Sequence, residues 1–213
     1  DDEANYLNGG NPLNMGDPVQ ITLNWDDWSQ SNQDYDLHLI KASDNSVVAS
    51  SDAFQTGSQD PTESIRTRVP EDGRYYAAVE IYNANSPQEL EMFFFGGGRT
   101  PEHNVPRGSV TAPAVGDYVT SVGAFFYRDG SLEDFSSHGP TNDGRTGIDV
   151  VAPDGVSNSA FGRYFGTSAA APHVGGVAAL MLADDTTLSP QDLEQKLEST
   201  ATDIRDPGED IES

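Results

Sequence analysis

The chain has 213 residues, no cysteine and a formal net charge of −24, from 35 acidic and 11 basic side chains. Disulfide bonds, thiol catalysis and cysteine-bound metals are therefore excluded, and so acidic a chain argues against nucleic acid as a partner. No run of 18 apolar residues occurs, so we expect no membrane span. Salt screens repulsion among acidic groups. With Lys41 and Lys196 as the only lysines, the composition favours a high-salt environment over that of an ordinary acidic secreted protein.

The first residues show no periodic pattern. Residues 1–16 contain Asn8-Gly9-Gly10-Asn11-Pro12, and we predict a loop or linker there. The opening Asp1-Asp2-Glu3 lacks the character of a signal peptide. We therefore expect the numbering to begin inside a longer precursor.

Residues 17–98 alternate apolar and polar side chains in short runs, which is typical of β-strands with one buried face. Turn residues such as Asp44-Asn45 and Asp72-Gly73 separate the runs. This pattern predicts an all-β antiparallel sandwich, followed by a hinge at Gly96-Gly97-Gly98 that leads into a second region over 99–213. The expected strands contain Val19–Trp25, Tyr35–Leu39, Ile65–Val69, Tyr75–Ile81 and Leu90–Phe94.

Four acidic residues lie within eleven positions of this β-rich region: Asp26, Asp27, Asp34 and Asp36. Hard carboxylate oxygens at close range are ligands for calcium, although the spacing is not that of an EF-hand. The alternative is that these are solvated acids on a very acidic protein. We expect the neighbouring Trp25 to pack in the core.

In the second region, strands alternate with helices, which predicts an α/β layer arrangement. Compact apolar strands are expected at Tyr118–Ala124 and Ile148–Ala152. The segment Ser168–Ala183 has a helical pattern that is apolar nearly all round, so we expect it to be buried. A second helix is expected to begin at Ser189, a good N-cap, with Pro190 in its first turn.

The sharpest chemical signal is Gly166-Thr167-Ser168-Ala169-Ala170-Ala171-Pro172-His173-Val174. A serine that starts a buried helix lies beside unpaired backbone N–H groups and the positive end of the helix dipole. Those groups are suited to stabilising an oxyanion while a carbonyl is attacked. We expect Pro172 in the first turn, where its missing N–H costs little. The alternative is that Ser168 caps an ordinary buried helix.

The segment GTSAAAPHVGGVAALML, from Gly166, closely resembles the nucleophile block of the subtilisin-like serine proteases. Three further blocks resemble the family in the same order: Tyr118–Ala124, Phe135–Pro140 and Ile148–Pro153. This chain departs from the family at Asp154, which stands before Gly155. The resemblance covers residues 105–205, about half the chain. It implies the C-terminal portion of an α/β subtilisin-like domain with a mostly parallel sheet, into which the β-sandwich is inserted.

The resemblance implies roles for two residues of this block. Ser168 would be the nucleophile, with its backbone N–H as an oxyanion donor, while His173 would be structural. The family's Asp and His blocks and its Ala-Gly-Asn motif are not found in these 213 residues. Because a triad needs a histidine base and a carboxylate that orients it, we expect these groups in an upstream half of the same precursor.

The resemblance thus implies a secreted endopeptidase that cleaves peptide or protein substrates through an acyl-enzyme, and a chain that is inactive alone. His138, inside the turn block, is a poor alternative base, and His38 is expected to be a partly exposed spacer on a strand. A lipase or esterase is disfavoured because Gly166-Thr167-Ser168-Ala169-Ala170 lacks the second glycine of Gly-x-Ser-x-Gly.

Two other classes remain open: a non-catalytic binding or recognition module, and a pseudoenzyme built on a subtilase remnant. The upstream sequence would discriminate them. Without upstream strands, we expect a bare sheet edge and a bare apolar face on the Ser168 helix. The chain should then self-associate or pack its sandwich over that face.

Overall fold

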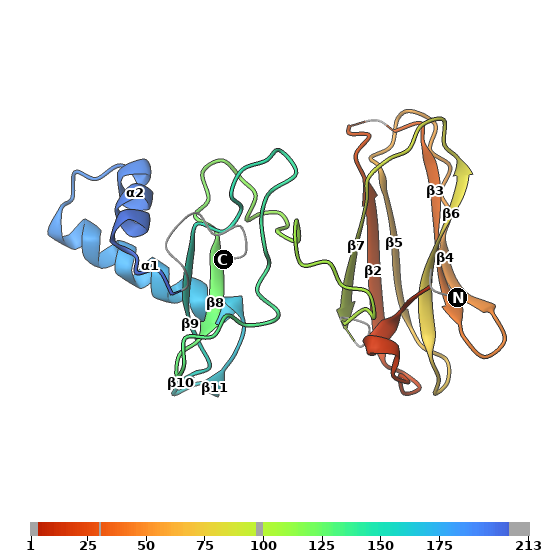
Figure 1. Ribbon diagram of the computed structural model, residues 1–213, viewed down its shortest axis with the longest axis horizontal. Coiled ribbons are helices and arrows are strands. Elements are labelled where there is room, and N and C mark those ends of the chain that lie inside the picture. The colour runs from red at the N-terminus through yellow and green to blue at the C-terminus, as the bar shows by residue number, and fades with distance from the viewer. Residues whose placement is uncertain (1–3, 30, 97–99, 205–213) are drawn as a thin grey trace. The chain divides into compact units, whose positions relative to one another are not determined.

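The computed structural model describes residues 4–29, 31–96 and 100–204, and the chain forms two compact units, residues 1–104 and 105–213 (Figure 1). The units divide between Asn104 and Val105, whereas the sequence analysis placed the boundary between residues 98 and 99. Gly97 and Gly98 of the predicted hinge lie outside the described residues. Each unit has its own buried cluster of side chains, so each is considered by itself.

The first unit contains two antiparallel sheets. One sheet has four strands in the order β1–β6–β3–β4, and the other has three in the order β5–β2–β7. The strands are β1 (Asn5–Tyr6), β2 (Pro18–Trp25), β3 (Asp34–Lys41), β4 (Ser46–Ser51), β5 (Thr62–Arg68), β6 (Tyr75–Asn83) and β7 (Leu90–Gly96).

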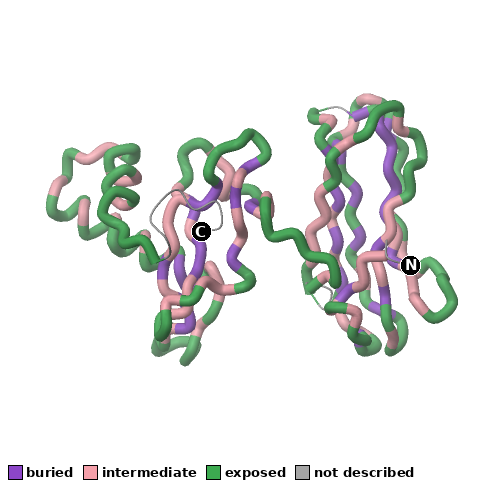
Figure 2. Tube along the Cα trace, viewed as in Figure 1, coloured by how far each residue is buried: buried purple, intermediate pink, exposed green. Residues whose placement is uncertain are grey.

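The core of this unit follows from the alternation in the sequence. On β2, every second side chain from Val19 to Trp25 is buried, and on β3 Tyr35, Leu37 and Leu39 are buried. These residues belong to one apolar cluster, seen as the purple segments of the strands in Figure 2. Full burial of such a side chain contributes about 1.5–3 kcal/mol, so the inward-facing residues of β2 and β3 account for much of this unit's stability.

The prediction of a loop over residues 1–16 is wrong for much of the described part. β1 pairs with β6, and Leu7 and Leu13 belong to the core cluster. Between these two leucines, the 3-10 helix η1 (Leu7–Gly10) turns through positive φ angles at Asn8 and Gly9. Asn and Gly tolerate that conformation, so the residues that suggested a loop instead form a tight turn that returns the chain to the core.

The second unit is built around one parallel strand pair and two helices. β8 (Val122–Phe126) pairs in parallel with β9 (Val150–Asp154), as a mostly parallel α/β sheet requires. A hairpin of β10 (Val156–Asn158) and β11 (Gly162–Tyr164) follows, then α1 (Thr167–Asp184) and α2 (Pro190–Thr200). As predicted, Ser189 caps α2, where it forms a reciprocal capping box with Asp192.

Both strands of the pair begin later than the sequence predicted. Tyr118 lies in a turn with 87% of its surface exposed, not in a strand. The backbone N–H of Ser121 donates to Asp149 Oδ2 at 2.6 Å, and the N–H of Asp149 donates to the Ser121 carbonyl at 3.1 Å. This polar pair occupies the position just before each strand, so regular pairing starts at Val122 and Val150.

The prediction that the Ser168 helix is buried is also wrong for this chain. Only Ala169 and Ala170 of α1 are buried, whereas Leu180 is 72% exposed and Val177 is 45% exposed. In the described part of the chain, α1 packs on β8, β9 and α2, and its burial is confined to the first turn (Figure 2). No helix in the described residues is long and apolar enough to cross a membrane.

Candidate active site

Ser168 is the second residue of α1, directly after the turn that follows β11. Gly166 caps the helix with φ 114° and ψ 161°, a conformation that residues with a Cβ rarely adopt. Ser168 is exposed, and its hydroxyl has no hydrogen-bond partner among the described residues. The turn therefore presents an accessible hydroxyl at the start of a helix.

Two backbone donors remain unused beside this hydroxyl. The carbonyl of Gly166 accepts from Ala169 at 2.8 Å and from Ala170 at 3.3 Å, which closes the first turn. The N–H groups of Thr167 and Ser168 have no partner within the described parts of the chain. Free N–H groups at the positive end of a helix are suited to binding an oxyanion.

The placement of Pro172 in the first turn was wrong. Because α1 begins at Thr167, Pro172 is its sixth residue and lies in the second turn. At this position an ordinary residue would donate its N–H to the Ser168 carbonyl, four residues back, and proline has no N–H to donate. The Ser168 carbonyl is thereby freed from the helical hydrogen-bond pattern.

His173 is tied to the helix backbone and not to Ser168. Its Nδ1 lies 2.8 Å from the carbonyl oxygen of Ala169, and because a carbonyl only accepts, Nδ1 carries the proton. His138, the alternative base, is held through its backbone by Ser109. In the ranges that the structure describes, no histidine hydrogen-bonds the Ser168 side chain.

A buried carboxylate lies behind the Ser168 turn. Asp154, the last residue of β9, has no exposed surface, and its Oδ2 accepts a hydrogen bond from the Gly166 N–H at 2.9 Å. Its Oδ1 is also buried and accepts from no N–H or hydroxyl group in the described part of the chain. In the sequence, Asp154 stands out only as a departure from the family pattern, which by itself indicates no role.

Glu133 interacts with this buried carboxylate. Burial raises the pKa of Glu133, and a hydrogen bond with Asp154 and the negative charge of Asp154 raise it further. The charges of Asp134 and Asp129 act in the same direction. Glu133 thus favours its neutral form more than an ordinary glutamate does.

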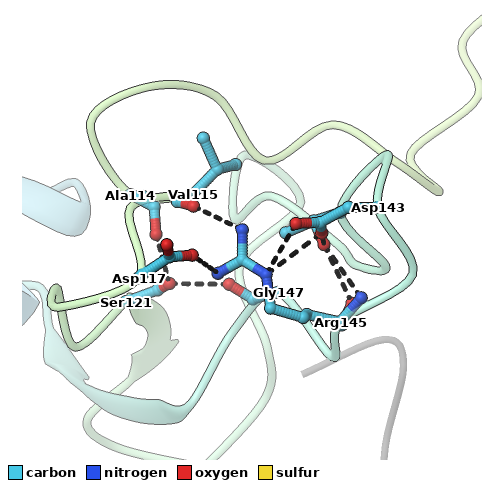
Figure 3. A network of polar contacts seen from close by, with 8 residues as sticks. Ala114, Val115, Asp117, Ser121, Asp143, Arg145 and Gly147 are labelled. Atoms are coloured by element: carbon cyan, nitrogen blue, oxygen red, sulfur yellow. Dashed lines mark hydrogen bonds and ion pairs between the residues drawn. The ribbon is translucent and has the colours of Figure 1, made fainter.

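A polar network fixes the loops that lead into β8 and β9 (Figure 3). Arg145 donates from Nη2 to the Val115 carbonyl at 2.6 Å, pairs with Asp143 at 2.9 Å and lies 3.6 Å from Asp117. Ser121 Oγ donates to the Gly147 carbonyl at 2.6 Å. The network joins residues 114–121 to residues 143–147, and so it sets the positions at which the two parallel strands start.

Beside this network lies a cavity of about 250 Å³ lined in part by Asp149, Glu194 and Glu198. One carboxylate oxygen from each lies within 4.8 Å of the others. Burial raises the pKa of Asp149 and of Glu198. Sequence reasoning missed this group because Asp149 lies just before β9, whereas Glu194 and Glu198 lie on α2. No spacing in the sequence indicates that these two segments are in contact.

Among the described residues, the four predicted calcium ligands do not form one group close enough to hold a metal ion together. Asp26 Oδ1 accepts from the backbone N–H of Glu89 at 3.0 Å, and Asp27 Oδ2 accepts from Ser31 Oγ at 2.8 Å. These two carboxylates therefore stabilise the loops next to β2. Trp25 is buried as expected, and its indole N–H donates to the same Ser31 hydroxyl at 2.8 Å.

The other two predicted ligands, Asp34 and Asp36, lie two residues apart on β3 and are both buried. Asp34 is 3% exposed, and its Oδ1 has no partner among the residues described. Burial, then the charge of Asp34, raises the pKa of Asp36. Asp36 forms a group with His38 and Glu80, whose ligand atoms lie within 4.8 Å of one another. His38, predicted to be a spacer, contacts both Ser50 and Glu80.

Comparison with known proteins extends these observations. The sequence profile of the subtilase family, Peptidase_S8, matches residues 45–212. Subtilisin from Bacillus pumilus is 46% identical over 61 residues, which cover 26% of this chain and 22% of that protein. Subtilisin E from Bacillus subtilis (strain 168) has the same identity over 61 residues, or 16% of its length.

A solved structure of the Clostridium perfringens CspB protease matches with a TM-score of 0.62 at 18% identity, over 99% of this chain and 51% of that one. At this identity the match shows a shared fold. The chain spans about half of that protein, and the matched part is less than a quarter of each curated relative.

Proposed function

The chain belongs to the subtilase family, and from this premise we propose that it is part of a secreted serine endopeptidase in which Ser168 is the nucleophile. The observation that carries the proposal is the exposed Ser168 hydroxyl at the start of α1, beside the unpartnered N–H groups of Thr167 and Ser168. The proposed substrates are peptides or proteins.

In the proposed reaction, Ser168 Oγ attacks the scissile carbonyl and forms an acyl-enzyme that water then hydrolyses. The carbonyl oxygen gains negative charge during the attack, and the Ser168 N–H donates to it. Loss of one oxyanion donor typically raises the barrier by about 2.7–4 kcal/mol. His173 takes no part in proton transfer in this proposal, because its Nδ1 is held at the Ala169 carbonyl and, among the described residues, no hydrogen bond joins its ring to the Ser168 side chain.

The base and its orienting carboxylate come from an upstream half of the same precursor in this proposal. Support comes from the described residues, in which no histidine bonds to Ser168. It follows that the 213-residue chain is inactive by itself. The β-rich unit, residues 17–98 in the sequence analysis, is proposed to be a sandwich inserted into the catalytic domain, and the charge of −24 supports a high-salt medium.

Calcium binding remains a proposal, now confined to Asp34 and Asp36 on β3. The support is the buried Oδ1 of Asp34, which has no hydrogen-bond partner in the described ranges, next to a second buried carboxylate. Carboxylate oxygens are the ligands that calcium prefers. Asp26 and Asp27 are left out because one oxygen of each already accepts a hydrogen bond from a loop.

A second candidate is a recognition module or pseudoenzyme built on a subtilase remnant. It is favoured by the absence of a base beside Ser168 in the described part, together with a first unit that has a complete core of its own. The experiment that separates the two candidates is Ser168→Ala in a protein that contains the upstream half. The endopeptidase proposal requires loss of turnover with an unchanged fold, and undiminished turnover would contradict it.

A further inference from the structure

The fully buried carboxylate of Asp154 has no role in the chemistry proposed for Ser168. Its Oδ2 accepts from the Gly166 N–H at 2.9 Å, while its Oδ1 is shielded from solvent and accepts from no N–H or hydroxyl group in the described part of the chain. A buried carboxylate with an unsatisfied oxygen opposes folding. Its burial therefore requires a compensating interaction in its surroundings.

Asp154 acts on the turn that presents Ser168. The N–H of Gly166 is held by Asp154, and its carbonyl is held by Ala169 and Ala170. Both polar groups of the cap residue are thus fixed, two positions before Ser168. With the Gly166 N–H already used, the N–H groups left free are those of Thr167 and Ser168, which are the candidate oxyanion donors.

The compensating interaction comes from Glu133. Its segment runs beside β8, since the Glu133 N–H donates to the Ala124 carbonyl at 3.0 Å and the Phe126 N–H donates to the Ser131 carbonyl at 2.8 Å. The opposite edge of β8 pairs with β9, where Phe126 of β8 is in register with Asp154 of β9. The Glu133 side chain hydrogen-bonds Asp154. Two carboxyl groups hydrogen-bond only when one of them carries a proton.

We propose that Asp154 is a positioning residue for the Gly166–Ser168 turn, and that it acts as an acid pair with Glu133 in which one carboxyl keeps its proton. The catalytic meaning of the pair rests on the proposed function, because the turn matters for chemistry only if Ser168 is the nucleophile. The pair itself is a property of the fold and is testable in the 213-residue chain.

The acid pair makes the turn sensitive to pH in a defined direction. The charged groups that act on Glu133, namely Asp154, Asp134 and Asp129, are all acidic and raise its pKa above the ordinary 4.5. The stabilisation that the neutral Glu133 gives is complete below pH 4.5 and is lost as the pH rises through its raised pKa. Above that point two negative charges face each other, and the turn should loosen.

The test measures amide hydrogen exchange at Gly166 by NMR, with protection corrected for the intrinsic exchange rate, from pH 4.5 upward. In the wild type we expect a protected Gly166 amide whose protection falls as the pH rises. Asp154→Ala should lower the protection about tenfold or more, the scale of a hydrogen bond to a charged group. Glu133→Gln and Asp154→Asn should retain protection and remove its pH dependence. Asp134→Asn, next to Glu133 but exposed, removes one of the charges that raise the pKa of Glu133, so it should keep Gly166 protected and shift the fall in protection to lower pH.

Unchanged Gly166 protection in Asp154→Ala would overturn the positioning role, and an unchanged pH profile in Glu133→Gln would overturn the acid pair. If Asp154→Ala fails to fold, the isosteric Asp154→Asn and Glu133→Gln still decide the pair through their pH profiles. Failure of the proposed function would be seen separately. In that case Ser168→Ala would leave turnover of the longer protein intact, while the Gly166 exchange profiles would still follow the expectations given above.

Discussion

Ser168 and His173 lie on the same helix five residues apart, yet the imidazole of His173 bonds to the Ala169 carbonyl at 2.8 Å and leaves the serine hydroxyl without a partner in the described part of the chain. Residues five apart do not share a helix face, so helix geometry and the observed hydrogen bond agree. The nearest histidine in sequence is thus structural. A peptidase mechanism at Ser168 needs a base from elsewhere.

The net charge of −24 predicts that stability depends on salt. Raising the salt from about 0.1 M to about 1 M shortens the Debye length from about 10 Å to about 3 Å, which weakens repulsion among the acidic groups of the folded chain. We expect the melting temperature to rise over this range, measured by circular dichroism. A near-neutral protein of similar size is the control. A flat or falling melting temperature would contradict adaptation to high salt.

Calcium binding at Asp34 and Asp36 predicts a saturable heat in titration calorimetry at fixed ionic strength. The double variant Asp34→Asn/Asp36→Asn should abolish this heat. Asp26→Asn should not, because the Asp26 carboxylate accepts a hydrogen bond from the backbone N–H of Glu89. Since the pKa of Asp36 is raised by burial and by Asp34, protons compete with the cation and affinity should increase with pH. Equal responses to calcium and magnesium at matched ionic strength would indicate screening and contradict the site.

The apolar residues that α1 exposes predict self-association of the isolated chain. Leu180 is 72% exposed and Val177 is 45% exposed on the same helix. Light scattering should give a mass above that of a monomer, rising with concentration, and Leu180→Ser should lower it. Met15→Ser removes a side chain of similar exposure, 70%, away from α1 and is the control. A chain that stays monomeric at all concentrations, or equal effects of the two variants, would contradict this prediction.

The sequence was most informative where one physical pattern dominates. Alternation predicted the regions of β2 and β3, because their inward side chains enter a single core. It missed β4, whose Val47 is 58% exposed and whose burial does not alternate clearly. It also missed β1, which has two residues and depends on pairing with β6. Edge strands are defined by their neighbours, and sequence pattern alone does not carry that information.

At the candidate site, the nucleophile was predicted from a local motif, since Ser168, its turn and its helix are contiguous in sequence. The acid pair was missed because Glu133 and Asp154 meet only across β8, in the folded chain. One signal was present: the additional Asp154 before Gly155. An acidic residue at the end of an apolar strand is costly to bury, so its presence indicates a specific role.

Labelling with a fluorophosphonate probe tests whether Ser168 is a nucleophile whose base lies outside this chain. The adduct is located by peptide mass mapping, in the 213-residue chain and in a longer protein that includes the upstream half, with Ser168→Ala as the control for each. We expect an adduct on Ser168 in the longer protein and little or none in the isolated chain. Stoichiometric labelling of Ser168 in the isolated chain, or no adduct on Ser168 in the longer protein, would contradict it.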